Sequence, residues 1–118
     1  MIFDFVIVGG GAAGLSAAIT FFNESTPSRR NKIIILERMD RIGKKILATG
    51  NGRCNLSNEN ISSEKYSSST PEILAKMITK MQPSVTLDFF HKLGLFCRTD
   101  ADGRIYPYCN QASVVLDV

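Results

Sequence analysis

The sequence predicts an α/β fold that opens with a strand, a helix and a second strand parallel to the first. Residues 2–8 and 32–37 are short, β-branched and almost continuously apolar, which is the pattern of strands covered on both faces. Residues 12–23 lie between them and repeat apolar side chains at helical spacing. The three segments therefore form a βαβ unit, whose crossover is nearly always right-handed.

The composition is that of one globular unit. The chain has 118 residues, of which 44% are hydrophobic and 21% are charged, so it can bury one core. Its net charge is +3, and its Lys and Arg residues are spread along the chain rather than clustered as in nucleic-acid-binding proteins. Cys54, Cys97 and Cys109 form neither a CxxC pair nor a zinc pattern. We therefore expect a cytoplasmic protein with no nucleic-acid partner, no disulfide framework and no metal site.

The apolar opening of the chain, residues 5–22, could also be a signal peptide or a membrane span. A signal peptide begins with basic residues, whereas residues 1–8 contain Asp4 and neither Lys nor Arg. A spanning helix rarely contains four glycines within six residues, as residues 9–14 do. We therefore expect neither export nor insertion into a membrane.

Two amphipathic helices are predicted in the second half of the chain, after a Ser-rich polar linker at residues 58–70. Pro71–Lys80 follows Thr70, a suitable cap, and has proline at its first helical position. Ser84–Leu93 is a second helix of the same kind, and Gly94 ends it.

A short β-hairpin is predicted after these helices. Leu95–Arg98 and Arg104–Tyr106 read as strands around the turn signal Asp102-Gly103. A last helical pattern follows, with Asn110 as its cap, and the chain stops within it. We therefore expect the chain to be the N-terminal piece of a longer protein.

A dinucleotide fingerprint lies between the first strand and the helix. Gly9, Gly11 and Gly14 spell GxGxxG directly after the strand. Gly9 permits the tight turn, Gly11 leaves room for a pyrophosphate, and Gly14 lets the helix pack closely on the strand. The helix start offers unpaired N–H groups and the positive end of its dipole to the phosphates. The alternative is a tight strand-to-helix turn without a ligand.

Glu37 ends the second strand, at about the distance from Gly14 at which the fingerprint places an acidic residue. Its carboxylate can accept hydrogen bonds from the adenosine ribose hydroxyls, and its charge repels a 2′-phosphate. Glu37 therefore favours FAD or NAD over NADP, and the fingerprint alone leaves FAD and NAD open. A solvated carboxylate without a ligand is the alternative for this residue.

Three motifs together resemble one enzyme family. They are the glycine fingerprint, the run GKKILATGNGRCNLSN at residues 43–58, and DGRIYP at residues 102–107. This combination resembles the BaiN-like flavoproteins, also called aminoacetone-oxidase-like FAD-binding enzymes, over the whole chain. The resemblance implies a Rossmann-like FAD-binding βαβ unit and an inserted second domain. Family members are several times longer, so the unit is incomplete here.

The resemblance also implies which residues bind the cofactor. The pyrophosphate would be held by Gly9, Gly11, Ala12, Ala13 and Gly14, the adenosine end by Glu37 and Arg38, and the pyrophosphate or ribityl region by Lys44 and Lys45. The residues near the isoalloxazine ring would be Thr49, Gly50, Asn51, Gly52, Arg53, Cys54 and Asn55. A cation or amide near N1 and O2 of the ring stabilises the reduced flavin, and Arg53 and Asn51 are the candidates.

No residue of this chain is singled out as catalytic. Cys54 has no partner cysteine at exchange spacing and reads as a small packed residue. His91, the one histidine, reads as an exposed helix residue.

We predict the FAD-binding N-terminal portion of a flavin-dependent oxidoreductase that passes hydride between the flavin and a small organic substrate, with NAD(P)H or oxygen closing the cycle. Residues 1–58 would hold the FAD-binding βαβ unit and the flavin loop, and residues 59–118 the helical and hairpin segment. This piece alone would be inactive. Its unpaired sheet edges would allow a homo-oligomer. The alternatives are a non-catalytic nucleotide-binding or assembly fragment, and a piece of an NAD-dependent dehydrogenase, which gives residues 43–58 no purpose.

Overall fold

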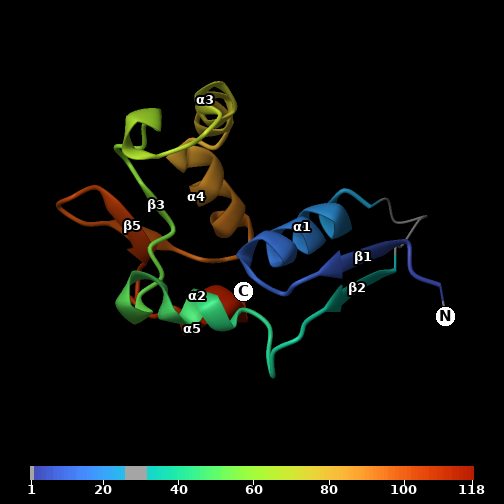
Figure 1. Cartoon of the computed structure of the whole chain (residues 1–118). Helices are drawn as coiled ribbons and strands as arrows, with labels where there is room; N and C mark the ends of the chain where they lie inside the picture. Colours follow the sequence, from blue (N-terminus) through green and yellow to red (C-terminus); the bar gives the residue numbers. More distant parts are fainter. Residues whose placement is uncertain (1, 26–31) are drawn as a thin grey trace. The chain divides into compact units, whose positions relative to one another are not determined.

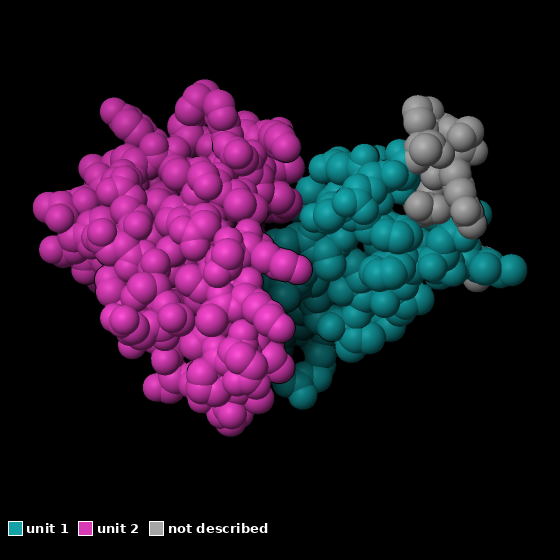
Figure 2. Space-filling view, turned by 90° about the horizontal axis from the view of Figure 1, so that it is seen from above, with its two compact units in different colours: residues 1–47 teal, residues 48–118 magenta. Residues whose placement is uncertain are grey.

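The computed structural model describes residues 2–25 and 32–118. The chain forms two compact units, Met1–Leu47 and Ala48–Val118, which Figure 2 colours teal and magenta. These units are defined by internal contacts and do not decide where a functional domain ends. The domain boundary expected at residue 58 therefore stays a prediction.

The first unit is the βαβ unit that the sequence predicts. Strand β1 (Phe5–Val8), helix α1 (Ala12–Asn23) and strand β2 (Ile33–Leu36) follow one another, and the two strands pair in parallel from Phe5 opposite Ile33 to Val8 opposite Leu36. Figure 1 shows α1 running alongside the two-stranded sheet. The helix has the predicted bounds, and both strands are shorter than the predicted segments.

The strands of this unit are covered on one face only, although their apolar sequences are typical of strands covered on both faces. Side chains alternate between the faces of a strand, and in β1 Ile7 is 8% exposed whereas its neighbours Val6 and Val8 are 54% and 85% exposed. Phe5, on the same face as Ile7, stacks on Phe21 of α1 with ring centroids 4.3 Å apart. Within the described part of this unit α1 covers that face, and no element covers the other.

A short helix, α2 (Lys44–Ala48), forms within the motif run at residues 43–58, and a 3₁₀ turn, η1 (Thr49–Gly52), follows it. The helix is held by its apolar side chains, of which Ile46 is buried. Gly43 precedes the helix with φ of +67° and donates its N–H to the carbonyl oxygen of Gly10 at 2.7 Å. The segment is therefore fixed to the glycine turn by a backbone bond.

The second unit contains a three-stranded antiparallel sheet in the order β3-β5-β4, formed by β3 (Ser57–Asn58), β4 (Cys97–Thr99) and β5 (Arg104–Pro107). Strands β4 and β5 are the predicted hairpin, with Arg98 opposite Tyr106. Strand β3 was not predicted, because two residues are too few to show an alternating pattern. The sheet carries much of the core of this unit, since Ile105 and Tyr106 are 1% and 3% exposed.

The helices of the second unit are close to the predicted ones. Helix α3 (Pro71–Lys80) has the predicted bounds, and α4 (Pro83–Lys92) begins one residue earlier than expected. Thr70 is the N-cap of α3, as predicted, but its side chain makes no cap bond, and its hydroxyl lies 3.4 Å from the Ser68 hydroxyl. A 3₁₀ turn, η2 (Ser63–Lys65), precedes α3.

Asn110 is not the cap of the last helix, α5 (Ser113–Asp117), so that prediction is also wrong. Its φ is +57°, a left-handed conformation that asparagine tolerates, and its N–H donates to the carbonyl oxygen of Pro107 at 2.9 Å. Asn110 therefore turns the chain after β5.

Among the described helices, none combines the length and the apolar character that a membrane span requires.

Candidate functional site

The glycine turn begins at the carboxyl end of β1. Gly9 has a φ of +102°, which side chains other than that of glycine rarely allow, and its N–H donates to the carbonyl oxygen of Leu36 at 2.8 Å. This bond continues the pairing of the two strands by one residue. The turn therefore leaves the sheet at the edge where α/β folds place their ligands.

Gly14 and Gly11 differ in the space around them. A Cβ on Gly14 would lie 2.0 Å from the carbonyl oxygen of Gly9 and 3.1 Å from Cγ2 of Ile7, so only glycine lets α1 approach the strand this closely. A Cβ on Gly11 would have no other protein atom within 4 Å. Gly14 is thus required by the packing of the unit, whereas Gly11 borders open space.

The start of α1 is open to an anion. Gly11 stands at the N-cap without a side-chain cap bond, and the first intrahelical bond runs from the N–H of Leu15 to the carbonyl oxygen of Gly11. The N–H groups of Ala12, Ala13 and Gly14 precede that bond and have no partner within the helix. Ala12 and Ala13 are exposed, and the first turn contains no acidic residue. These amides and the helix dipole favour negative charge at this position.

Glu37 is bonded to the glycine turn. Its Oε2 accepts the N–H of Gly10 at 2.8 Å, and its Oε1 accepts the N–H of Met39, also at 2.8 Å. The Met39 amide, followed by that of Gly10, lowers the pKa of the Glu37 carboxyl below its ordinary value. The stabilisation by these bonds is therefore complete above the pKa of the unfolded chain and is lost as the pH falls through the lowered folded pKa.

Gly10 is a residue of this site that the sequence reading missed. Its N–H donates to Glu37, its carbonyl oxygen accepts the N–H of Gly43, and a Cβ on it would lie 2.6 Å from Cγ2 of Ile42. It therefore links the turn after β1 to the segment after β2. The signal in the sequence was a glycine at position 10, between Gly9 and Gly11, where the fingerprint accepts any residue.

Three of the cations predicted to bind the cofactor, Arg38, Lys44 and Lys45, are exposed in the first unit. Lys44 forms an ion pair with Asp40 at 2.9 Å, and the two side chains are 50% and 70% exposed. Such surface pairs contribute about 1 kcal/mol or less, so a phosphate could replace Asp40 as the partner.

The remaining predicted residues, 49–55, form a loop in the second unit that we call the flavin loop. Its backbone is left-handed at four positions, with φ of +55° at Gly50, +56° at Asn51, +80° at Gly52 and +59° at Cys54. Residues other than glycine seldom adopt such values, and they concentrate at functional sites. The loop is held by bonds from the N–H of Cys54 to Thr49 and from the N–H of Ala112 to Gly52, at 3.0 and 2.8 Å.

Two side chains of the flavin loop reach strand β5. The guanidinium carbon of Arg53 lies 4.5 Å from the ring centroid of Tyr106, and its Nη2 donates to the Tyr106 hydroxyl at 3.3 Å. The amide nitrogen of Asn55, in the orientation that satisfies both neighbours, donates to the carbonyl oxygens of Ser57 and Ile105 at 2.8 and 3.2 Å. Tyr106 is a second contact residue that the sequence reading did not single out, because only the folded chain brings it to the loop.

Cys54 and the hairpin turn have structural surroundings. All three cysteines lie among the described residues and are free thiols, and Cys54 is 6% exposed. In the turn, Nε of Arg104 donates to Oδ2 of Asp100 at 2.9 Å, and Arg104 also pairs with Asp102. Partial burial opposes ionisation of Asp100, but the bonds from the Arg104 backbone and guanidinium outweigh it and lower the pKa of that carboxyl.

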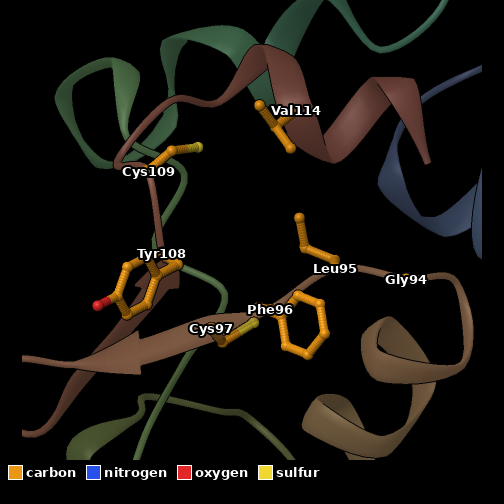
Figure 3. Close-up of a pocket in the computed structure, with 7 residues that line it drawn as sticks. All are labelled: Gly94, Leu95, Phe96, Cys97, Tyr108, Cys109 and Val114. Carbon is orange, nitrogen blue, oxygen red and sulfur yellow. The ribbon is translucent and has the colours of Figure 1, made fainter.

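An open apolar cavity of about 540 Å³ also lies in the second unit. Figure 3 shows its lining residues, which are Gly94, Leu95, Phe96, Cys97, Tyr108, Cys109 and Val114. Burial raises the pKa of the Cys97 thiol, so this group is protonated at neutral pH.

No cluster of three or more metal-ligating side chains occurs in the described part of the chain.

Comparison with known proteins identifies the chain's relatives. A family model described as the HI0933-like protein Rossmann domain matches residues 3–118. The chain is 43% identical over 112 residues to the 3-dehydro-bile acid delta(4,6)-reductase of Clostridium scindens, covering 95% of this chain and 26% of that protein. It is 25% identical over 104 residues to the ribosomal RNA dihydrouridine synthase of Escherichia coli K12, covering 88% and 25%. The chain thus spans about a quarter of these relatives.

Proposed function

The chain belongs to the HI0933-like family of FAD-binding Rossmann domains, and on this premise we propose that its glycine turn and Glu37 hold the ADP half of FAD. The family resemblance, the Rossmann-like fold and the FAD cofactor expected from the sequence are confirmed. The assignment of individual residues to parts of the cofactor is our proposal.

The open space at Gly11 carries the proposal. No protein atom lies within 4 Å of the place where a Cβ would stand, and the unpaired amides of Ala12 and Ala13 begin the helix beside it. A pyrophosphate needs both features, because its oxygens approach the backbone closely and accept bonds from amides. The residues present therefore fit the diphosphate of FAD.

Glu37 keeps the capacity to bind the adenosine ribose. Its Oε2 accepts the N–H of Gly10 and its Oε1 that of Met39, and the Arg38 backbone also contributes, whereas a carboxylate offers about four lone pairs, so the group can accept a further bond. The lowered pKa keeps the group ionised at neutral pH, which is the state that accepts bonds from ribose hydroxyls. Arg38 would add positive charge at the adenosine end, and Lys44 and Lys45 would add it at the pyrophosphate or ribityl region.

The flavin loop is proposed to bind near the isoalloxazine ring. Its glycines allow the backbone to lie against a flat ring, and Arg53 and Asn51 are the groups that would stabilise negative charge at N1 and O2. When bound, FAD supplies two-electron hydride chemistry, and the residues of this chain bind and orient it. The contacts of Arg53 with β5 support this role, because a cation held in place stabilises negative charge on the ring better than a mobile one.

For the whole protein we propose an oxidoreductase that passes hydride between the flavin and a small organic substrate, with NAD(P)H or oxygen completing the cycle. The two relatives are named for different substrates, a bile acid and ribosomal RNA. We therefore assign the cofactor half of the reaction to this domain and leave the choice of substrate to the rest of the protein. The three free thiols favour a reducing, cytoplasmic location.

The proposal predicts that the chain binds FAD at least about a hundredfold more tightly than NAD, a difference of about 2.7 kcal/mol. Glu37→Gln should weaken FAD binding about tenfold, because one backbone amide and the ribose lose their acceptor. Isothermal calorimetry and the quenching of flavin fluorescence would measure both effects. Glu24→Gln makes the same change on an exposed glutamate at the far end of α1 and should change affinity by no more than about twofold.

Two results would contradict this proposal. Saturable binding of NAD without binding of FAD would favour the dehydrogenase alternative. Equal affinities of the Glu37→Gln and Glu24→Gln variants for FAD would remove Glu37 from the site, since general charge would then account for its effect.

A further inference from the structure

We infer that Tyr106 is a positioning residue, whose ring and hydroxyl fix the guanidinium of Arg53 for the flavin. This inference rests on the proposed function, because it assumes that the flavin loop binds the ring system. It assigns a role to a residue of β5 that neither the fingerprint nor the flavin loop contains.

The contacts of Arg53 define the orientation of its guanidinium. The group lies over the Tyr106 ring at 4.5 Å, its Nη2 donates to the hydroxyl of the same ring at 3.3 Å, and its Nε donates to the carbonyl oxygen of Gly50 at 3.3 Å. A guanidinium that lies over a ring and is bonded at two nitrogens has little freedom to rotate. Arg53 is therefore held from two sides, by β5 and by its own loop.

Tyr106 is itself rigid enough to serve as the support. Its side chain is 3% exposed, and its backbone pairs with Arg98 within the β4-β5 ladder. A Cβ on Gly50 would lie 3.2 Å from Cε1 of the Tyr106 ring and 2.6 Å from the N of Asn55. The left-handed turn of the loop therefore packs directly against the ring that holds Arg53.

The arrangement leaves part of Arg53 available for a ligand. A guanidinium has five N–H donors, and within the second unit two of them bond to Gly50 and Tyr106. The side chain is only partly buried, so the other donors can reach a bound group. Lysine could not replace arginine here, because an ammonium lacks the plane that stacks and the donors on separate nitrogens.

A double-mutant cycle on the 118-residue chain tests this role, with FAD affinity measured by titration. Tyr106→Leu and Arg53→Met should each weaken FAD binding about tenfold, and the double variant should be no weaker than Arg53→Met alone. Tyr106→Phe keeps the stacked ring and should stay within about threefold of the wild type. If Tyr106→Leu weakens binding by the same factor in the wild type and in the Arg53→Met variant, its role is only structural and the inference is overturned.

A second readout does not need FAD. In NMR spectra of the chain, the ring current of Tyr106 should place the Arg53 Nε–H resonance further upfield in the wild type and in Tyr106→Phe than in Tyr106→Leu, since the bond from Nε to Gly50, which shifts this resonance downfield, does not involve the substituted side chain. If Tyr106→Leu does not fold, the wild type still decides, because an Arg53 Nε as mobile in its heteronuclear NOE as that of exposed Arg38 overturns the inference. If the wild type shows the shift but does not bind FAD, the proposed function fails separately.

Discussion

Replacing Gly11 by valine should abolish FAD binding and leave the chain folded. The Cβ of residue 11 would enter open space, where no other protein atom lies within 4 Å, and φ of −82° and ψ of −175° suit a β-branched residue. The loss of glycine at the N-cap should cost about 1 kcal/mol of stability. The branched side chain would occupy the position proposed for the pyrophosphate, so affinity should fall at least about a hundredfold.

Fluorescence titration with FAD and a thermal melt followed by circular dichroism measure the two sides of this prediction. Ser16→Val is a control, because it introduces the same side chain later in α1, beyond the amides that start the helix. It should keep its affinity for FAD. If Gly11→Val also keeps it, the diphosphate does not bind over this turn.

Replacing Gly14 by alanine should have the largest effect on stability. The added Cβ would lie 2.0 Å from the carbonyl oxygen of Gly9 and 3.1 Å from Cγ2 of Ile7, so α1 must move away from the sheet. Overpacking of this kind costs about 3 kcal/mol or more when backbone atoms must shift. In a domain of this size that loss should lower the Tm by about 10 °C or more.

Gly11→Ala is the matched control for Gly14→Ala, because it adds the same methyl group to the same turn in open space. Its melting curve should lie within a few degrees of the wild type. Equal Tm values for Gly14→Ala and the wild type would mean that the helix and strand are not packed as the Gly9 and Gly14 contact requires.

The elements that the sequence predicted well are those whose signals are local. The bounds of α1 and α3 follow from helical spacing with a glycine turn or a proline at the start, and Asp102-Gly103 marks the turn of the hairpin. Helix α2 and strand β3 were missed because each is too short for a periodic pattern and depends on partners elsewhere. Gly43, directly before α2, donates its N–H to the carbonyl oxygen of Gly10, and β3 pairs with β5.

The site residues also differ in whether their signals in the sequence are local. The sequence alone shows the spacing of Gly9, Gly11 and Gly14 and the position of Glu37. The structure places these residues at one edge of the βαβ unit. Gly10 and Tyr106 have no such spacing, because their importance comes from contacts with residues far away in the sequence. The apolar composition of the strands does not say which elements cover their faces, and in the structure α1 covers one of the two.

The most direct test of the FAD site is a titration of the ¹⁵N-labelled chain with FAD, followed by ¹H–¹⁵N correlation spectra. We expect the largest amide shifts at the start of α1, in Gly11, Ala12, Ala13 and Gly14, with helix α3 as an internal reference that does not shift. Saturable binding with unchanged amides in this turn, or with shifts confined to the cavity around Leu95 and Tyr108, would contradict the proposed site.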